Sequence, residues 1–478
     1  MQQEEVVQLV KKIQGMKTEW QTVEVKAAHG GFPKLYDTLS SFSNQDDGGV
    51  IILGVDEASS YKVVGVYDAS DAQKKLMEAC GQMEPPVRAL ITVAEVDGMN
   101  VVTAEVPGVE FANRPVYYRG TGRLKGSYVR VGDADEHMNE FEVYSYEAFR
   151  KRIHDELRTV DRASMEMLDA SQLQKYIRSV KKARKNLAEN VSDDWILKLM
   201  GIKESDEPTL AGVMCFSPYP QAYFPQLCIT AVVVPGTKIG DMGDEDERFI
   251  DNERITGSIS DMVESGVEFV RRNSRTKTII DHDGKRNDKT EYPIKAVREA
   301  ILNMMIHRDY SMYTENIPSS IEMYRDRIVF RNPGGLFGAA SVELLGRVRP
   351  ETRNPVLANI MEIMNVTENR YSGIPTIFNE LEAAGLGRPE FKVAHGEFSL
   401  TFYNDYFSLK DTIDKSDMER AIVQFCKTPR SRKEIIDFVG KSSYYVMSRY
   451  VNPMVESGKL ARSLPEKPKS SKQKFYSK

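Results

Sequence analysis

The 478-residue chain is too long to fold around one hydrophobic core, so we expect about two to four domains. A hydrophobic content of 41%, a charged content of 28% and a net charge of −5 describe an ordinary globular protein, in which any nucleic-acid site must be local. Four scattered cysteines with no CxxC pair exclude a disulfide framework and a cysteine-based zinc site.

Residues 1–150 predict an α/β domain. A charged N-terminal helix precedes a strand over 21–26, a helix over 33–43 and a continuously apolar, buried strand over 50–55. Further strands are expected near 90–106 and 115–131. The N-terminal helix lacks the apolar segment of a signal peptide, and no run reaches the roughly 18 to 20 apolar residues of a membrane span. We therefore expect a cytoplasmic protein with no membrane partner.

Charged side chains flank two of these strands. Glu24 and Lys26 share one face of the first strand because they are two residues apart, Glu19 precedes them, and Asp56 ends the buried strand. Three carboxylates near a lysine can hold a divalent metal that activates water for phosphodiester cleavage, so these four are candidate nuclease residues. The alternative is that they are surface charges of a docking or nucleic-acid-binding domain.

Residues 151–205 are charged and helical, and we expect them to connect two domains. The next domain, over 206–410, begins with two apolar runs at 210–216 and 228–234 and continues with an acidic, loop-like stretch over 236–254. A helix is expected over 258–272.

A helix opened by Pro293 carries the most informative pattern in the chain. Glu299, Asn303 and His307 follow one another at intervals of four residues, so they share one helical face. An apolar stripe lies opposite: Ile294, Val297, Ile301 and Met304. The carboxylate could orient water, and the amide oxygen could ligate Mg²⁺ in a nucleotide pocket. From spacing alone, a solvated polar face is the favoured alternative.

Hairpin strands over 320–323 and 328–330 follow, and Asn332-Pro333-Gly334-Gly335 makes a tight turn after them. A helix is expected over 355–364, and another helix starts near Ser372-Gly373.

Residues 411–478 predict a winged helix-turn-helix, with helices over 417–426, 431–439 and 442–456. From Lys427 to Lys478 there are 13 Lys and Arg against 4 Asp and Glu, a net charge of +9 that suits DNA phosphates. The candidates for DNA contact are Lys441, Ser442, Ser443, Tyr444 and Arg449 around the recognition helix, with Lys459, Arg462 and Lys467 on phosphates. A basic protein-docking or dimerisation module is the alternative.

Three segments together resemble one bacterial family. They are Val23-Glu24-Val25-Lys26 through Gly48 to Glu57, then Tyr128 to Ala134, and lastly Ala296 to Tyr310 with Asn332 to Leu336. The chain resembles the Schlafen AlbA-type transcriptional regulators, whose members are also labelled divergent AAA proteins. The resemblance implies an α+β multidomain fold: an AlbA-like α/β domain, a GHKL-like α/β sandwich related to the RecG C-terminus, and a C-terminal winged helix-turn-helix.

The resemblance also implies roles for residues. Glu299 and Asn303 are similar to the N-box of GHKL ATPases, in which the Glu activates water and the Asn holds Mg²⁺, and His307 sits where that box continues. Asn332-Pro333-Gly334-Gly335 is similar to the adenine-reading box, with an Asn in place of its Asp. Ser372-Gly373 sits where a phosphate loop opens a helix, with a single glycine. ATP and Mg²⁺ are the implied cofactors.

In the N-terminal domain, the spacing of Glu19 and Glu24 is similar to that of the eukaryotic Schlafen nucleases. We expect a DNA-binding transcriptional regulator with a nucleotide-sensing GHKL-like domain, and a homo-oligomer by analogy with dimeric DNA binders. The alternatives are a metal-dependent nuclease, a GHKL-type ATPase, or a scaffold that binds neither ligand. A helicase is excluded, because the motor needs a GxxxxGK[ST] loop. The only GK[ST] tripeptide is Gly440-Lys441-Ser442, and Ile435 stands where the first glycine must be.

Overall fold

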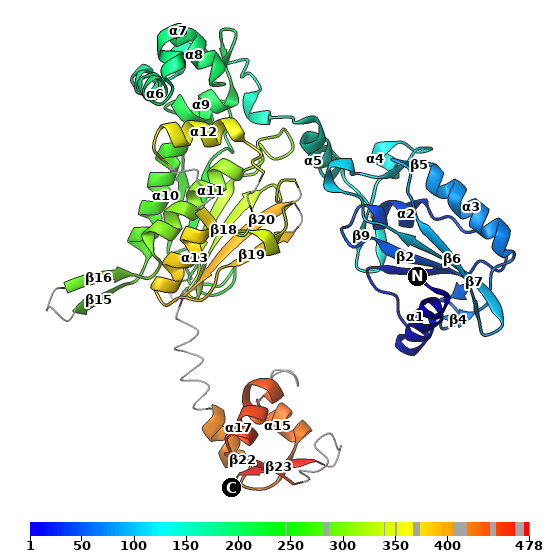
Figure 1. Cartoon of the computed structure of the whole chain (residues 1–478). Helices are drawn as coiled ribbons and strands as arrows, with labels where there is room; N and C mark the ends of the chain where they lie inside the picture. Colours follow the sequence, from blue (N-terminus) through cyan, green and yellow to red (C-terminus); the bar gives the residue numbers. More distant parts are fainter. Residues whose placement is uncertain are drawn as a thin grey trace.

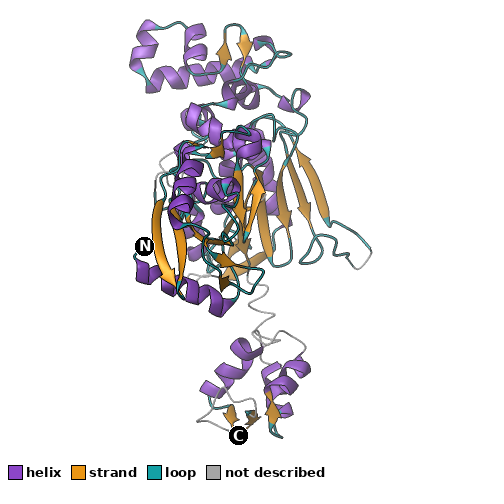
Figure 2. Ribbon diagram, turned by 90° about the vertical axis from the view of Figure 1, so that its right-hand side faces the viewer, coloured by secondary structure: helices purple, strands orange, loops and turns teal. Residues whose placement is uncertain are grey.

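The computed structural model describes residues 1–243, 246–280, 286–338, 340–348, 351–366, 373–394, 396–404, 418–439, 446–463 and 473–477. They form an N-terminal unit, a larger middle unit and a C-terminal unit, each containing helices and strands (Figures 1 and 2). Within these described ranges, no helix is both long and apolar enough to cross a membrane. Together, the three units make the chain a mixed α/β protein with several sheets, as the sequence predicted.

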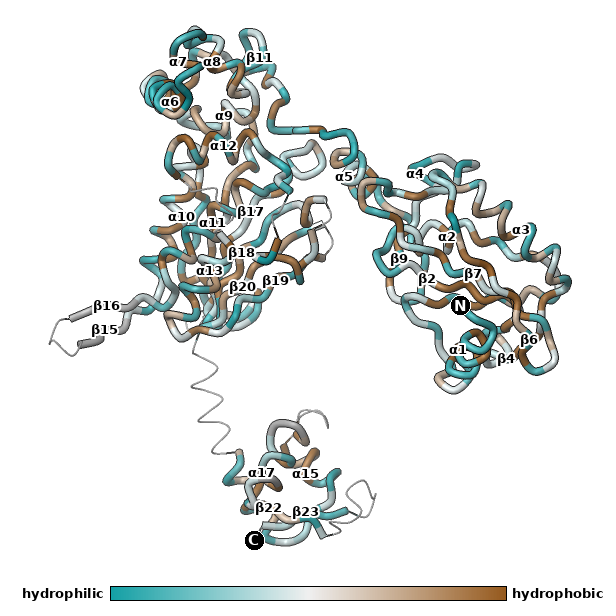
Figure 3. Tube along the Cα trace, in the orientation of Figure 1, coloured by the Kyte–Doolittle hydropathy of each residue, from teal (hydrophilic) through white to brown (hydrophobic). Residues whose placement is uncertain are grey.

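The N-terminal unit is built on a four-stranded sheet in the order β1-β2-β7-β6, in which only β1 and β2 are parallel. Helix α1 packs on one face of the sheet, and α2 and α3 pack on the other. Strand β2 is buried on both faces, since Ile51 and Leu53 face α2 and Ile52 faces α1. This explains the continuous apolar run in the sequence, and Figure 3 shows the hydrophobic residues following these central strands. The bounds are α1 Gln3–Met16, β1 Val23–Lys26, α2 Tyr36–Ser43, β2 Gly49–Leu53, β3 Val55–Asp56, β4 Lys62–Val63, α3 Ala69–Gly81, β6 Leu90–Val96 and β7 Met99–Val106.

Smaller elements complete this unit and lead out of it. Strands β5 and β8 pair with each other, β9 and β10 form a hairpin beside α2, and helix α5 carries the chain toward the middle unit (Figure 1). Their bounds are β5 Met83–Glu84, β8 Tyr117–Tyr118, α4 Arg123–Gly126, β9 Tyr128–Val131, β10 Ala134–His137 and α5 Glu140–Lys151.

The middle unit contains a six-stranded sheet in the order β14-β13-β17-β18-β20-β19. Helices α10, α11 and α13 cover one face of it (Figure 1). The predicted hairpin is confirmed, because β17 and β18 are antiparallel neighbours. The strands are β13 Ile229–Val233, β14 Asp251–Ile255, β17 Ser319–Met323, β18 Arg327–Pro333, β19 Glu390–Ala394 and β20 Glu397–Tyr403, and the helices are α10 Ile259–Asn273, α11 Ile294–His307, α12 Pro355–Ile363 and α13 Gly373–Ala383. A separate hairpin, β15 Thr276–Ile280 with β16 Arg286–Thr290, joins α10 to α11.

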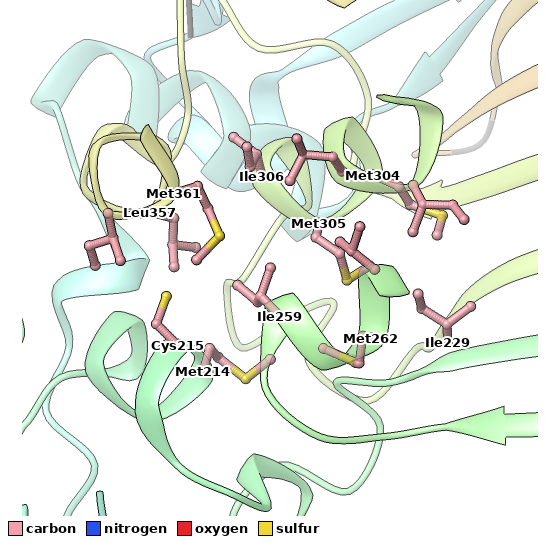
Figure 4. Packing of buried hydrophobic residues seen from close by; sticks show 14 of the residues in the cluster. Met214, Cys215, Ile229, Ile259, Met262, Met304, Met305, Ile306, Leu357 and Met361 are labelled. Carbon is pink, nitrogen blue, oxygen red and sulfur yellow. The ribbon is translucent and has the colours of Figure 1, made fainter. Parts of the chain in front are cut away.

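The predicted helical connector shares the core of this middle unit. Its helix α6 (Ala170–Ala183) buries Leu173, Tyr176, Ile177 and Val180 in the same cluster as α9 to α12. Figure 4 shows side chains of α9, α10, α11 and α12 meeting in this cluster. The remaining helices here are α7 Lys185–Asn190, α8 Asp193–Leu199 and α9 Leu210–Phe216, and β11 Lys203–Glu204 pairs with β12 Glu207–Pro208.

Two segments of the middle unit have a conformation that the sequence pattern did not show. The apolar run at 210–216 is helix α9, because the Thr209 side chain accepts a hydrogen bond from the Gly212 N–H at 3.0 Å and caps it. The expectation of a loop is wrong for residues 251–255, which form the edge strand β14 along β13. Charged residues alternate along that edge and disguise it in the sequence, although such charges are usual on strands at the edge of a sheet.

The C-terminal unit combines short helical segments with a three-stranded sheet in the order β21-β23-β22. Its small core includes Ile422, Ile435, Val451, Met454 and Phe475. Residues 418–425 are helical, followed by β21 Arg430–Ser431, α15 Arg432–Val439, the π-helical segment Met447–Val451, α17 Asn452–Glu456, β22 Leu460–Arg462 and β23 Lys474–Ser477.

Two buried charges follow α11 and fix its end. Arg308, only 2% exposed, donates hydrogen bonds to the Ser319 hydroxyl and the Thr314 carbonyl, each at 2.9 Å, and to the Ile317 carbonyl. Asp309, 1% exposed, pairs with Arg353 near the start of α12. These bonds tie the end of α11 to β17 and to α12.

Replacing Arg308 by methionine is expected to lower the free energy of unfolding by about 3 kcal/mol, because two buried acceptors and the part-buried Ile317 carbonyl lose their donor. Calorimetric melting of the full chain would measure it. Arg271→Met is the matched control. Arg271 is exposed and pairs with Glu268 on its own helix, so this variant should melt at the same temperature as wild type. Equal losses in both variants would contradict this account of Arg308.

Candidate functional site

Helix α11 presents its predicted polar face to a cavity of about 1140 Å³. Glu299, Asn303 and His307 all line this cavity, while the rest of the helix is largely buried in the core. The Asn303 side chain donates from Nδ2 to Glu299 Oε1 at 3.1 Å. The three residues that share a helical face therefore line one wall of a cavity, whereas spacing alone favoured a solvated stripe.

Helix α13 begins at Gly373, directly against this wall. A Cβ atom at Gly373 would lie 2.2 Å from Glu299 Oε1 and 3.1 Å from Asn303 Nδ2, so any larger residue would displace the carboxylate. The N-terminus of an 11-residue helix thus faces the two polar side chains of α11. Free N–H groups at a helix N-terminus are suited to bind phosphate. Ser372, predicted beside Gly373, lies outside the described residues.

The imidazole of His307 is neutral at physiological pH. Burial lowers its pKa from the ordinary 6.5 to about 4, and the nearby Arg353 adds to the shift. A neutral ring next to a phosphate site can donate or accept a hydrogen bond without adding charge.

The connector supplies basic residues that sequence reasoning missed. Lys182 and Arg184, at the end of α6, line the cavity together with Lys295 and Arg298 of α11. The signal in the sequence is the basic run from 181 to 185, which lies within the predicted connector.

The predicted adenine box does not line the cavity in the described part of the chain. The Ser319 hydroxyl donates to Asn332 Oδ1 at 3.0 Å and itself accepts from Arg308. Gly334 has φ +95°, and a Cβ there would lie 2.6 Å from the Asp309 Cβ. The Gly335 carbonyl accepts from Arg353 at 3.1 Å. These residues support the end of α11, which is a structural role.

The polar residues of the cavity fit a Mg²⁺-nucleotide. Asn303 donates from Nδ2 to Glu299, and its Oδ1, which has no hydrogen-bond partner among the described residues, is an oxygen of the kind that Mg²⁺ prefers. Across the described ranges, no group of three or more His, Cys, Asp and Glu could hold a metal by itself.

The N-terminal carboxylates of the nuclease alternative have hydrogen-bond partners within their own domain. Glu24 is 5% exposed, and its two oxygens accept from Lys26 and, at 2.9 Å, from Arg130. Glu19 accepts from the Val25 N–H at 2.7 Å, and burial raises its pKa to about 7. Asp56 instead accepts from the Ala58 N–H at 3.2 Å in the turn that follows it. Both oxygens of Glu24 thus already accept from cationic side chains of its own domain.

The predicted DNA-contact residues are only partly described. Lys459 is exposed and pairs with Glu419 at 2.6 Å, and Arg462 lies on β22 opposite Phe475 of β23. Arg449 lies in the π-helical segment, and nothing is described of its side chain. The other candidates lie outside the described residues: Lys441, Ser442, Ser443, Tyr444 and Lys467.

Two family models match the chain. Residues 19–139, the sheet of the N-terminal unit, match the model described as "Schlafen, AlbA_2". Residues 318–402, from β17 to β20, match the model described as "Putative ATP-dependent DNA helicase recG C-terminal". The chain is therefore a multidomain α/β protein with an ATPase-like domain. It carries an N-terminal Schlafen AlbA_2 domain and a RecG C-terminal-like domain, as its motifs predicted.

Two solved structures are similar to the chain. The crystal structure of the DIP2311 protein from Corynebacterium diphtheriae is 17% identical, covers 95% of this chain and 93% of that protein, and has a TM-score of 0.39. The solution structure of the N-terminal domain of a "Putative ATP-dependent DNA Helicase RecG-related Protein" from Nitrosomonas europaea is 24% identical, covers 29% of this chain and 94% of that domain, and has a TM-score of 0.24. A comparison with curated proteins gave no match.

A buried carboxylate anchors α12, another wall of the cavity. Glu156, which is 0% exposed, accepts from the N–H groups of Val356 at 2.8 Å and Leu357 at 2.7 Å. Burial raises the pKa of Glu156 from 4.5 to about 7, although the two N–H donors act in the opposite direction.

This shift makes the stability of the fold depend on pH. Since the folded state holds a proton on Glu156 up to about pH 7, while the unfolded chain releases it near 4.5, stability falls as pH rises between those values. The free energy of unfolding should fall by roughly 3 kcal/mol across this pH range. We expect Glu156→Gln to flatten the fall of melting temperature across this window, relative to wild type. An unchanged pH profile would contradict the assignment.

Proposed function

We propose that this protein is a DNA-binding transcriptional regulator whose RecG-like domain binds a Mg²⁺-nucleotide in the cavity on α11. The observation that carries the proposal is the meeting of Glu299, Asn303 and Gly373 at one wall of that cavity. A carboxylate, an amide oxygen and the N-terminus of a helix provide the three interactions that a hydrated cation and its phosphates require.

The surrounding residues support nucleotide binding. Lys182 and Arg184 bring positive charge to the cavity, and the neutral His307 leaves that charge in place for phosphates. When bound, Mg²⁺ would neutralise phosphate charge, and Asn303 would hold it through Oδ1. Glu299, held by the amide of Asn303, would orient a water for hydrolysis if the domain is also a GHKL-type ATPase. The base is left unassigned, because Asn332 is engaged with Ser319 away from the cavity.

Asn303→Ala should weaken the binding of ATP with Mg²⁺ at least tenfold, about 1.4 kcal/mol, because the cation ligand is lost. Isothermal titration calorimetry on the full chain would measure it. Asn252, exposed on the edge strand β14, provides the control Asn252→Ala, which should bind like wild type. Equal affinity of the Asn303 variant and wild type, or no binding by wild type, would refute a nucleotide site here.

For DNA, we propose that the C-terminal unit acts as a winged helix. The helical segments and three-stranded sheet of this unit support the proposal, and the net charge of +9 over residues 427–478 suits the phosphate backbone. Nucleotide binding would shift the DNA-binding state, and a homo-oligomer would place two such units on one duplex.

Lys459→Ala combined with Arg462→Ala should make duplex binding less dependent on salt. Each phosphate contact contributes a slope of about −0.9 to the plot of log K against log salt, so the slope should shrink by up to about 2. Fluorescence anisotropy with a labelled random duplex would measure it. The control is Lys74→Ala with Arg271→Ala, which removes two exposed charges elsewhere. A slope equal to wild type, or DNA binding that survives deletion of residues 411–478, would oppose this assignment.

A further inference from the structure

Helix α6 lies outside both segments that match known domain families, yet it forms a wall of the cavity. We propose that its Lys182 and Arg184 bind the phosphates of a nucleoside triphosphate and distinguish it from a diphosphate. This inference rests on the proposed nucleotide site and adds a second phosphate-binding wall to it.

The charge on this wall is unusual because no carboxylate neutralises it. The Arg184 guanidinium donates to Asn359 Oδ1 at 2.9 Å and to the Met200 sulfur at 3.2 Å, both of which are uncharged acceptors. Lys182 is exposed, and no ion pair joins it to any described residue. Arg184 likewise has no carboxylate partner within the described part of the chain.

The other two basic residues that line the cavity are paired with carboxylates, which sets Lys182 and Arg184 apart. On the opposite wall, Lys295 pairs with Glu380 at 3.6 Å and Arg298 pairs with Glu264. On α6 itself, Lys181 does not line the cavity and pairs with Asp193 at 2.5 Å. The cations left without carboxylates are therefore those on the α6 side of the cavity, where an anionic ligand would neutralise them.

The wall is also held in position. Tyr176, Ile177 and Val180 are buried in the core of the middle unit, and Asp169 caps the helix by accepting from the Gln172 N–H at 3.0 Å. Figure 3 shows that the rest of α6 is largely hydrophilic, as expected for a helix with one buried side. Because the helix is ordered before the ligand arrives, placing these two cations beside the phosphates costs little conformational entropy.

The charge balance selects the ligand class. A triphosphate carries one more phosphate than a diphosphate, so two unpaired cations favour it more strongly. The preference concerns the phosphate chain and not the base, so inorganic triphosphate should share it.

The test is calorimetric binding of ATP, ADP and inorganic triphosphate, each with Mg²⁺, to the full chain. The variant Lys182→Ala/Arg184→Ala should bind ATP and triphosphate at least tenfold more weakly than wild type and should lose most of the preference for ATP over ADP. Lys175→Ala/Lys181→Ala removes two charges from the same helix outside the cavity and should bind like wild type. As a second measurement, ATP should slow amide hydrogen exchange over residues 179–187 in wild type and not in the Lys182/Arg184 variant.

The two possible failures are distinguishable. If wild type binds ATP, Asn303→Ala does not, and Lys182→Ala/Arg184→Ala keeps both the affinity and the preference of wild type, then the α6 proposal is wrong and the nucleotide site stands. If Lys182→Ala/Arg184→Ala and Lys175→Ala/Lys181→Ala weaken ATP binding equally, the loss comes from removing positive charge anywhere on the helix. The α6 proposal is then also wrong. If wild type binds none of the three probes, the nucleotide site itself is wrong.

Discussion

The burial of two opposite charges after α11 is the interaction on which the rest of the middle unit depends. Removing a guanidinium and a carboxylate from water costs several kcal/mol each, and only a nearly complete set of hydrogen bonds offsets that cost. Arg308 offsets part of this cost through three hydrogen bonds on the side of β17, although its Nε has no partner among the described residues. Asp309 pairs with Arg353 and accepts from the Ser311 N–H at 2.8 Å. Because these partners belong to separate segments, the bonds fix α11 relative to the sheet. These hydrogen bonds therefore also hold the face of α11 that lines the cavity in position.

The same network reaches the Schlafen AlbA_2 side of the chain. Arg353 lies over the ring of Phe337, with 5.2 Å between guanidinium and ring centroid, and Phe337 meets Phe149 of α5 edge to face at 5.4 Å. Tyr144, also on α5, donates to the two oxygens of Asp155 at 2.7 and 2.8 Å. Helix α5 therefore packs against the unit that holds the cavity, so the link between the two matched domains is a packed contact as well as a covalent connection (Figure 1).

The sequence predicted what depends on local periodicity. The shared face of Glu299, Asn303 and His307 follows from 3.6 residues per turn, and the structure places the three on one cavity. It could not predict what depends on partners far along the chain. Asn332 resembled an adenine-reading residue, but its hydrogen bond to Ser319 comes from strand pairing. Glu24 resembled a metal ligand, but Arg130, 106 residues later, occupies one of its oxygens.

The packing of the predicted connector could not be predicted from the sequence, and the reason is physical. A helix with a hydrophilic exterior and four buried side chains has the same sequence pattern whether it only connects two domains or also packs against one of them. In the structure, α6 packs against α12, and α12 starts on the carboxylate of Glu156, next to the Asp155 that binds α5. A ligand can shift a conformation only through contacts that differ between states. A nucleotide held between α6 and α11 would make such contacts with both helices. Its binding free energy would then reach the N-terminal domain through α12 and α5 rather than through the sheet, whose strands are already fixed by their backbone hydrogen bonds.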